Sequence, residues 1–124
     1  MPYQIIYSSQ ATTDMSVADL EQILVDARAG NEARNVTGAL IYVDGVFLQV
    51  LEGERNIVLD LMSSIAADSR HTMVKVFFEA EIDERTFGNW SMAYLNASSE
   101  QLSAWLGLPG TGTIESLLGG IQRD

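Results

Sequence analysis

The sequence has 124 residues, of which 47% are hydrophobic and 19% are charged, and it contains no cysteine. This length and balance are typical of one globular domain, and the missing cysteines exclude disulfides and thiolate metal sites. The formal net charge of −10 at pH 7 argues against nucleic acid and against an anionic membrane surface as partners.

No targeting or membrane-spanning segment is predicted. The N-terminus begins in a strand-like run and lacks the charged and apolar regions of a secretory signal. No apolar stretch approaches the roughly 20 residues that a membrane-spanning helix needs. We therefore expect a soluble, cytoplasmic protein.

The first third of the chain predicts a strand followed by a helix. Residues Tyr3 to Ser8 alternate in the manner of a strand. Ser16 and Asp19 have the spacing of an acidic capping box, which opens a helix. Apolar residues at helical spacing predict that the helix spans Ser16 to Ala29, with Gly30 as its C-terminal stop.

The remaining elements complete an α+β pattern. Asp44-Gly45 joins two apolar runs and predicts a hairpin with a type I′ turn. A second helix should end near Ala67, and strands are predicted over Met73–Ile82 and Trp90–Leu95. The order is then β-α-β-β-α-β-β, a ferredoxin-like sandwich with both helices on one face of a largely antiparallel sheet.

The C-terminal tail predicts a separate segment. Its two short apolar stripes, within 102–106 and 114–121, favour short helices that need a surface to dock against. We expect them to pack on the other face of the sheet. The chain would then divide into a core of residues 1–95 and a helical cap or output segment of residues 96–124.

Gln49 is an unexpected amide in an apolar strand. Burying an amide without a partner costs about 1–3 kcal/mol, so a polar group should lie opposite it unless it faces water. Gln49 shares a strand face with Phe47 and Leu51, and Tyr7 shares one with Ile5, so a Tyr–Gln pair across the sheet is possible. These residues alone leave two interpretations open, a satisfied core amide and a pair that switches its hydrogen bonds.

The other polar candidates also allow ordinary structural roles. Asn31, just past the predicted helix end, is typical of a cap or turn. Arg70 and His71 follow a helix C-terminus, where basic residues most often complement the helix dipole. The more specific alternative is that they bind an anion together with Asp68. Because His71 is the only histidine, we predict no metal site.

Trp90 and Met92 suit either a core or the wall of an aromatic ligand site. No glycine-rich phosphate loop, dinucleotide fingerprint or metalloprotease motif is present. The residues taken singly therefore do not name a ligand.

Taken together, the motifs resemble a known family. The sequences YSSQ from Tyr7, VTGALIYVDGVFLQVLEGE from Val36, DSRH from Asp68 and WSM from Trp90 occur in order, with Asn31 between the first two. Over residues 3 to about 95, this ordered set closely resembles the BLUF family of flavin-using blue-light sensor domains. The resemblance implies a non-covalently bound flavin that stands between the two helices. FAD is the usual flavin, and FMN or riboflavin are possible substitutes.

The resemblance also implies roles for individual residues. Gln49 would hydrogen-bond both the flavin ring and Tyr7, and Asn31 would hold the carbonyl edge of the ring. By the resemblance, Asp68, Arg70 and His71 would lie near the ribityl and phosphate part of the flavin. Trp90 and Met92 would report the switch to the surface. The chain departs from several relatives at Ala27, where they carry serine, and from some at Gly30, where they carry a polar residue.

The mechanism implied by the resemblance is a photocycle without substrate turnover, so no enzymatic activity is expected. Blue light makes oxidised flavin a strong electron acceptor, Tyr7 supplies an electron, and its proton moves toward the flavin through Gln49. Recombination leaves Gln49 rotated or tautomerised, and flavin absorption moves slightly to the red. We expect the signal to pass to an unknown protein partner or through a homo-oligomer.

Two alternatives to a blue-light photoreceptor remain open from the sequence. One is a small ferredoxin-like enzyme of the acylphosphatase type, which would want an arginine in a phosphate loop after the first strand, where this chain has Ser8-Ser9-Gln10. The other is a flavin-binding or interaction module that does not respond to light. Flavin absorption by the purified protein would distinguish the photoreceptor from the enzyme. A light-minus-dark spectrum would distinguish it from the module that does not respond to light.

Overall fold

A five-stranded sheet with two helices forms the described part of the chain, which covers residues 1–88 and 91–94 of a computed structural model. The elements are β1 (Tyr3–Ala11), α1 (Val17–Arg34), β2 (Thr37–Val43), β3 (Val46–Gly53), α2 (Arg55–Ala67), β4 (His71–Glu81) and β5 (Ala93–Tyr94). This order confirms the β-α-β-β-α-β-β prediction and the end of the second helix at Ala67. The predicted C-terminal helices lie outside the described residues.

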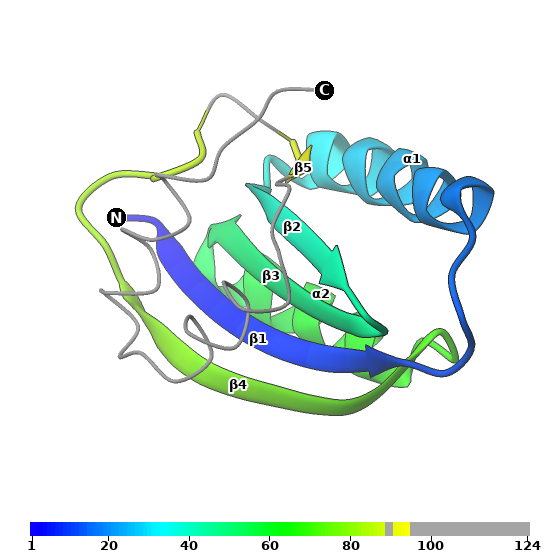
Figure 1. Cartoon of the computed structure of the whole chain (residues 1–124). Helices are drawn as coiled ribbons and strands as arrows, with labels where there is room; N and C mark the ends of the chain where they lie inside the picture. Colours follow the sequence, from blue (N-terminus) through cyan, green and yellow to red (C-terminus); the bar gives the residue numbers. More distant parts are fainter. Residues whose placement is uncertain (89–90, 95–124) are drawn as a thin grey trace.

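The sheet has the strand order β4-β1-β3-β2-β5, with β1 and β3 at its centre (Figure 1). Every neighbouring pair is antiparallel except β2 and β5, which are parallel. In Figure 1, α2 lies behind the sheet and α1 lies beside β2. Both helices connect strands that are not neighbours, because α1 leads from β1 to β2 across β3 and α2 leads from β3 to β4 across β1.

The core on the helix side follows from the two-residue period of the strands. Alternate side chains of the central strands are buried in one cluster with apolar side chains of both helices. The members are Tyr3, Ile5 and Tyr7 of β1, Phe47 and Leu51 of β3, Leu40 of β2, Ile23 and Leu24 of α1, Val58 and Met62 of α2, and also Val36 and Met92. The cluster places Tyr7 on the same side of the sheet as the helices.

The first helix begins as predicted and ends later than predicted. The backbone N–H of Asp19 donates to Ser16 Oγ, and the Ser16 N–H donates to Asp19 Oδ2, both at 3.1 Å, which confirms the capping box. The predicted stop at Gly30 is wrong, because α1 continues to Arg34. A glycine inside a helix costs only about 1 kcal/mol relative to alanine, so it does not by itself end one. The helix ends at Asn35, which adopts the left-handed conformation at φ 54°.

The hairpin between β2 and β3 confirms the type I′ prediction. Asp44 and Gly45 both have positive φ, at 49° and 81°. This turn brings Val43 opposite Val46 and sets Leu40 opposite Gln49. The fifth strand is shorter than predicted, at Ala93–Tyr94 instead of Trp90–Leu95, and Trp90 and Leu95 themselves lie outside the described residues.

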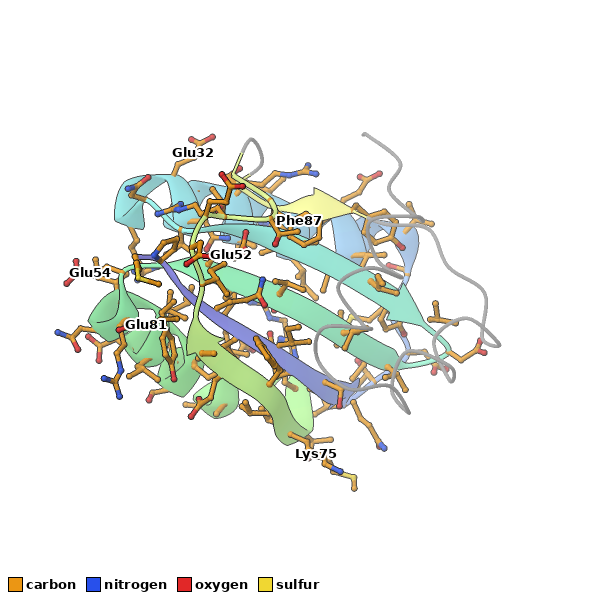
Figure 2. The ribbon with its side chains drawn as sticks, turned by 90° about the vertical axis from the view of Figure 1, so that its left-hand side faces the viewer. Glu32, Glu52, Glu54, Lys75, Glu81 and Phe87 are labelled. Carbon is orange, nitrogen blue, oxygen red and sulfur yellow. The ribbon has the colours of Figure 1, made fainter. Side chains whose placement is uncertain are left out.

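A buried carboxylate ties the loop after β4 to the sheet. Glu52 of β3 is fully buried, and it accepts hydrogen bonds from Gln4 Nε2 at 2.8 Å, the Thr86 N–H at 2.9 Å and the Phe87 N–H at 2.7 Å. Figure 2 shows Glu52 and Phe87 close together on this part of the sheet. Because Gln4 and Glu52 alternate with Tyr3, Ile5 and Leu51, they lie on the face opposite to the helices. No helix among the described residues is long and apolar enough to cross a membrane.

Candidate functional site

The predicted Tyr–Gln pair is present at the centre of the sheet. Tyr7 and Gln49 are directly opposite each other on β1 and β3, and the Tyr7 hydroxyl donates a hydrogen bond to Gln49 Oε1. Tyr7 is completely buried and Gln49 is 6% exposed. Burial raises the pKa of Tyr7 well above its ordinary value, and the negative charge of Asp68 raises it further. The phenol is therefore a neutral hydrogen-bond donor at any physiological pH.

The other end of the Gln49 amide contacts a methionine. Gln49 Nε2 lies 3.6 Å from the sulfur of Met92, which is buried. A thioether is a weak acceptor, so this amide N–H is held less firmly than the amide oxygen. Met92 thus faces inward beside the Tyr–Gln pair.

Helix α1 fixes the segment that carries Met92. Arg28 Nε donates to the Met92 carbonyl at 3.0 Å, and Asn31 Nδ2 donates to the Ser91 carbonyl at 2.6 Å. Asn31 is 2% exposed, so its predicted role as a cap or turn residue is wrong, and it is instead a buried helical residue. Among the described residues, the Asn31 amide oxygen has no hydrogen-bond partner.

A pocket opens between the two helices, directly over Gln49. Its inner walls are apolar and are supplied by both helices and by β2 and β3. These wall residues are Ile23, Ala27, Leu40, Leu51, Leu61 and Ile65. Two amides, Asn31 and Gln49, interrupt the apolar surface, while Tyr7 lies behind Gln49 and is not among the lining residues.

Charged side chains line the same pocket. Asp68, the residue after α2, accepts from Arg70 Nη2 at 2.7 Å and from Arg70 Nε at 3.1 Å. These hydrogen bonds lower the pKa of Asp68 to about 2 and raise that of Arg70. Arg70 also lies 3.4 Å from Asp26 of α1. Arg70 therefore makes direct ion pairs with two carboxylates.

His71, the first residue of β4, contacts side chains of β1 and β3. Its Nδ1 is 2.8 Å from Ser9 Oγ, and its ring lies 4.8 Å from that of Phe47 between centroids. The pKa of His71 is lowered, mainly because its imidazole is buried. The imidazole therefore lines the pocket as a neutral group at neutral pH.

The structure brings together six of the predicted site residues, namely Tyr7, Asn31, Gln49, Asp68, Arg70 and His71, and it adds Met92 through Gln49. Trp90 lies outside the described residues. Two residues were not predicted, Asp26 at the pocket and Arg28 against Met92. Neither has a local sequence signal, because each contact joins residues far apart in the chain. Within residues 1–88 and 91–94, no cluster of three or more His, Asp or Glu side chains suits a metal ion.

Comparison with known proteins gives one family. A family model described as "Sensors of blue-light using FAD", the BLUF family, matches residues 3–93. The chain belongs to the BLUF family. Its relatives include the photoactivated adenylate cyclase subunit alpha of Euglena gracilis, 42% identical over 101 residues. That match covers 82% of this chain and 10% of the relative, so the chain spans about a tenth of its length.

Solved BLUF structures of similar size share the fold. BlsA in its photo-activated state is similar with a TM-score of 0.88 at 29% identity, over 100% of this chain and 99% of that one. BlrB, a BLUF protein solved in its dark state, has a TM-score of 0.78 at 31% identity, over 94% of this chain and 91% of that one. The BLUF match accounts for most of the 124 residues.

BLUF domains bind flavin, and the pocket suits one. A flavin has a flat apolar ring system with carbonyl and ring-nitrogen edges, and FAD and FMN add phosphate. The pocket offers apolar walls, the amides of Asn31 and Gln49, and a guanidinium on Arg70. The Asn31 amide oxygen has no partner within residues 1–88 and 91–94. The donor set therefore fits the cofactor that the family implies.

Proposed function

We propose that this chain is a blue-light photoreceptor in which Tyr7 and Gln49 form the photoactive switch. The observation that carries the proposal is the buried hydrogen bond from the Tyr7 hydroxyl to Gln49 Oε1, at the base of a pocket that suits a flavin. Asn31 and Gln49 would hold the ring, and Arg70, His71 and Asp68 would lie near the ribityl and phosphate part. FAD is the expected cofactor, and FMN or riboflavin are possible substitutes.

The chemistry of the pair explains why a tyrosine and a glutamine suit this task. Flavin in its oxidised state becomes a strong electron acceptor when it absorbs blue light. Tyr7, which is completely buried, would be the electron donor, and losing an electron would make its hydroxyl strongly acidic. Gln49 Oε1 already accepts a hydrogen bond from that hydroxyl, so the proton would move to the amide along an existing hydrogen bond. Return of the electron and of a proton to Tyr7 would then restore the neutral phenol and leave Gln49 rotated or tautomerised. Because both side chains are neutral beforehand, no charge has to be buried in the resting protein.

The amide then has two arrangements of similar shape. Rotation or tautomerisation of Gln49 exchanges the positions of its donor and acceptor groups. This exchange would change both the hydrogen bond from Tyr7 and the weak contact from Nε2 to the Met92 sulfur. Met92 belongs to the segment that Arg28 and Asn31 hold, so a change at Gln49 reaches backbone atoms that lead away from the pocket.

We further infer that the chain senses light without turning over a substrate. Residues 1–95 would form the sensor, and residues 96–124 would form a cap or output segment. Its signal would pass to a protein partner or through a homo-oligomer in the cytoplasm.

An absorption spectrum of the purified protein, recorded in the dark and just after blue light, tests the proposal. We expect oxidised-flavin bands that move slightly to the red and return thermally in the dark. Flavin bands that do not move would identify a light-inert flavin-binding module. A colourless protein that also fails to take up added FAD would refute the proposal.

A further inference from the structure

The Arg70 guanidinium at the pocket is shared by carboxylates from two parts of the chain. Asp68 takes one side of the guanidinium, through Nε and Nη2. The remaining nitrogen, Nη1, lies 3.4 Å from Oδ2 of Asp26. Since Asp26 is on α1 and Arg70 follows α2, this ion pair connects the two sides of the pocket.

Asp26 is oriented from within its own helix. Gln22, one turn earlier, donates from Nε2 to Asp26 Oδ1 at 2.8 Å. This hydrogen bond leaves Oδ2 for Arg70. The Asp26 side chain is 50% exposed, and exposed ion pairs contribute little to folding stability. Asp26 can therefore be changed without disturbing the core.

The charges at the pocket add up unfavourably for an anion. Asp26 and Asp68 are two negative charges against the single positive charge of Arg70. His71 adds no second cation at neutral pH, because burial lowers its pKa. A phosphate pairs best with two nitrogens of one guanidinium. Asp68 takes one N–H each of Nε and Nη2. A phosphate that pairs with two nitrogens therefore uses the second N–H of Nη2 together with Nη1, where Asp26 already lies.

We propose that Asp26 is a specificity-determining residue that weakens the binding of phosphorylated flavins by competing with the phosphate for Nη1 of Arg70. This inference rests on the proposed flavin site and deepens it. Riboflavin lacks a phosphate and does not compete with Asp26, so its affinity should be independent of this carboxylate. The wild-type chain would therefore prefer FMN over riboflavin less strongly than the same chain without the Asp26 carboxylate.

The test is a titration of flavin-depleted protein with riboflavin and with FMN, followed by quenching of flavin fluorescence. These ligands differ only in the terminal phosphate. Asp26→Asn should raise the affinity for FMN by roughly two- to fivefold, the range expected for one exposed ion pair. It should leave the affinity for riboflavin unchanged. High salt should reduce the gain, because it screens exposed charges.

Glu54→Gln is the matched control, since it removes the same charge from an exposed site. Glu54 directly follows Gly53, which is opposite Tyr3, whereas His71 is opposite Ala11 at the far end of β1. This control should change neither affinity. Asp26→Asn should also lose most of its effect when Arg70 is replaced by glutamine.

The possible results separate this inference from the function on which it rests. An unchanged FMN affinity in Asp26→Asn, or an equal gain for riboflavin, would overturn the role of Asp26 while leaving the flavin site intact. A gain of the same size in Glu54→Gln, or an undiminished gain without Arg70, would also overturn it. If the wild-type protein binds neither flavin, the proposed function and this inference both fail.

Discussion

Replacing Glu52 by glutamine removes a buried charge while keeping the size of the side chain. The two carboxylate oxygens accept three hydrogen bonds, from Gln4 Nε2, Thr86 N–H and Phe87 N–H. A glutamine offers one acceptor oxygen and one NH₂ group that cannot accept. If the glutamine oxygen lies near Thr86, the Phe87 N–H faces the NH₂ group and has no acceptor. If the oxygen lies near Phe87, the Thr86 N–H faces the NH₂ group and has no acceptor.

The expected loss of stability follows from these contacts. A hydrogen bond to a charged group contributes about 1.5–3 kcal/mol, and a buried donor without an acceptor costs about 1–3 kcal/mol. Removing a buried charge offsets part of this, because the carboxylate is costly to desolvate. We therefore expect Glu52→Gln to lower the free energy of unfolding by about 2–4 kcal/mol.

Urea unfolding at neutral pH, with the same saturating flavin for every variant, measures this change. Glu79→Gln is the control, because Glu79 is an exposed glutamate on β4 and its replacement should be nearly neutral. A loss in Glu52→Gln that is no greater than in the control would refute the interpretation that Glu52 anchors the loop after β4.

Three further predictions, two from substitutions and one from a titration, test other parts of the structure. Tyr7→Phe should keep the flavin colour and lose the light-induced red shift, since it removes the hydroxyl that Gln49 accepts; a normal shift in the difference spectrum would exclude Tyr7 from the switch. The NMR titration of His71, the only histidine, should have its midpoint below the ordinary pKa of 6.5. Because the unfolded chain then binds this proton more readily, stability should fall as the pH drops below about 6.5; a midpoint at or above 6.5 would contradict burial as the dominant cause. Gly38→Ala should cost more than about 2 kcal/mol in urea unfolding, because a Cβ there would lie 1.9 Å from the carbonyl oxygen of residue 50. Gly88→Ala, where the closest contact is an ordinary 3.4 Å, should cost much less.

The sequence predicted the fold well, because its strongest signals are local. The Asp44-Gly45 turn and the capping box at Ser16 each act within a few residues, and each has the expected geometry. The first strand is present as predicted, but its burial does not alternate, because Tyr3 to Tyr7 are all buried. The end of α1 was predicted wrongly, because both Gly30 and Asn35 can end a helix. Only the packing of Asn31 against Ser91 and the left-handed conformation of Asn35 distinguish them.

The candidate site was predictable where strand geometry sets it. The two-residue period made a Tyr7–Gln49 pair possible, and the antiparallel register of β1 and β3 brings the two residues directly opposite each other. The ion pair between Asp26 and Arg70 depends on how two helices approach each other, which no local pattern records. The burial of Glu52 was not predictable either, since its partners are Gln4 of β1 and a loop that includes Thr86, 34 residues later in the chain.

The most direct test of the proposed switch compares light-minus-dark absorption spectra of the wild-type protein and of Gln49→Leu. Leucine has a similar size and cannot accept the Tyr7 hydroxyl or donate to a flavin. We predict that both proteins carry oxidised flavin and that only the wild-type bands move to the red after blue light and recover in the dark. A normal, reversible red shift in Gln49→Leu would contradict the proposal that the Tyr7–Gln49 pair is the photoactive switch.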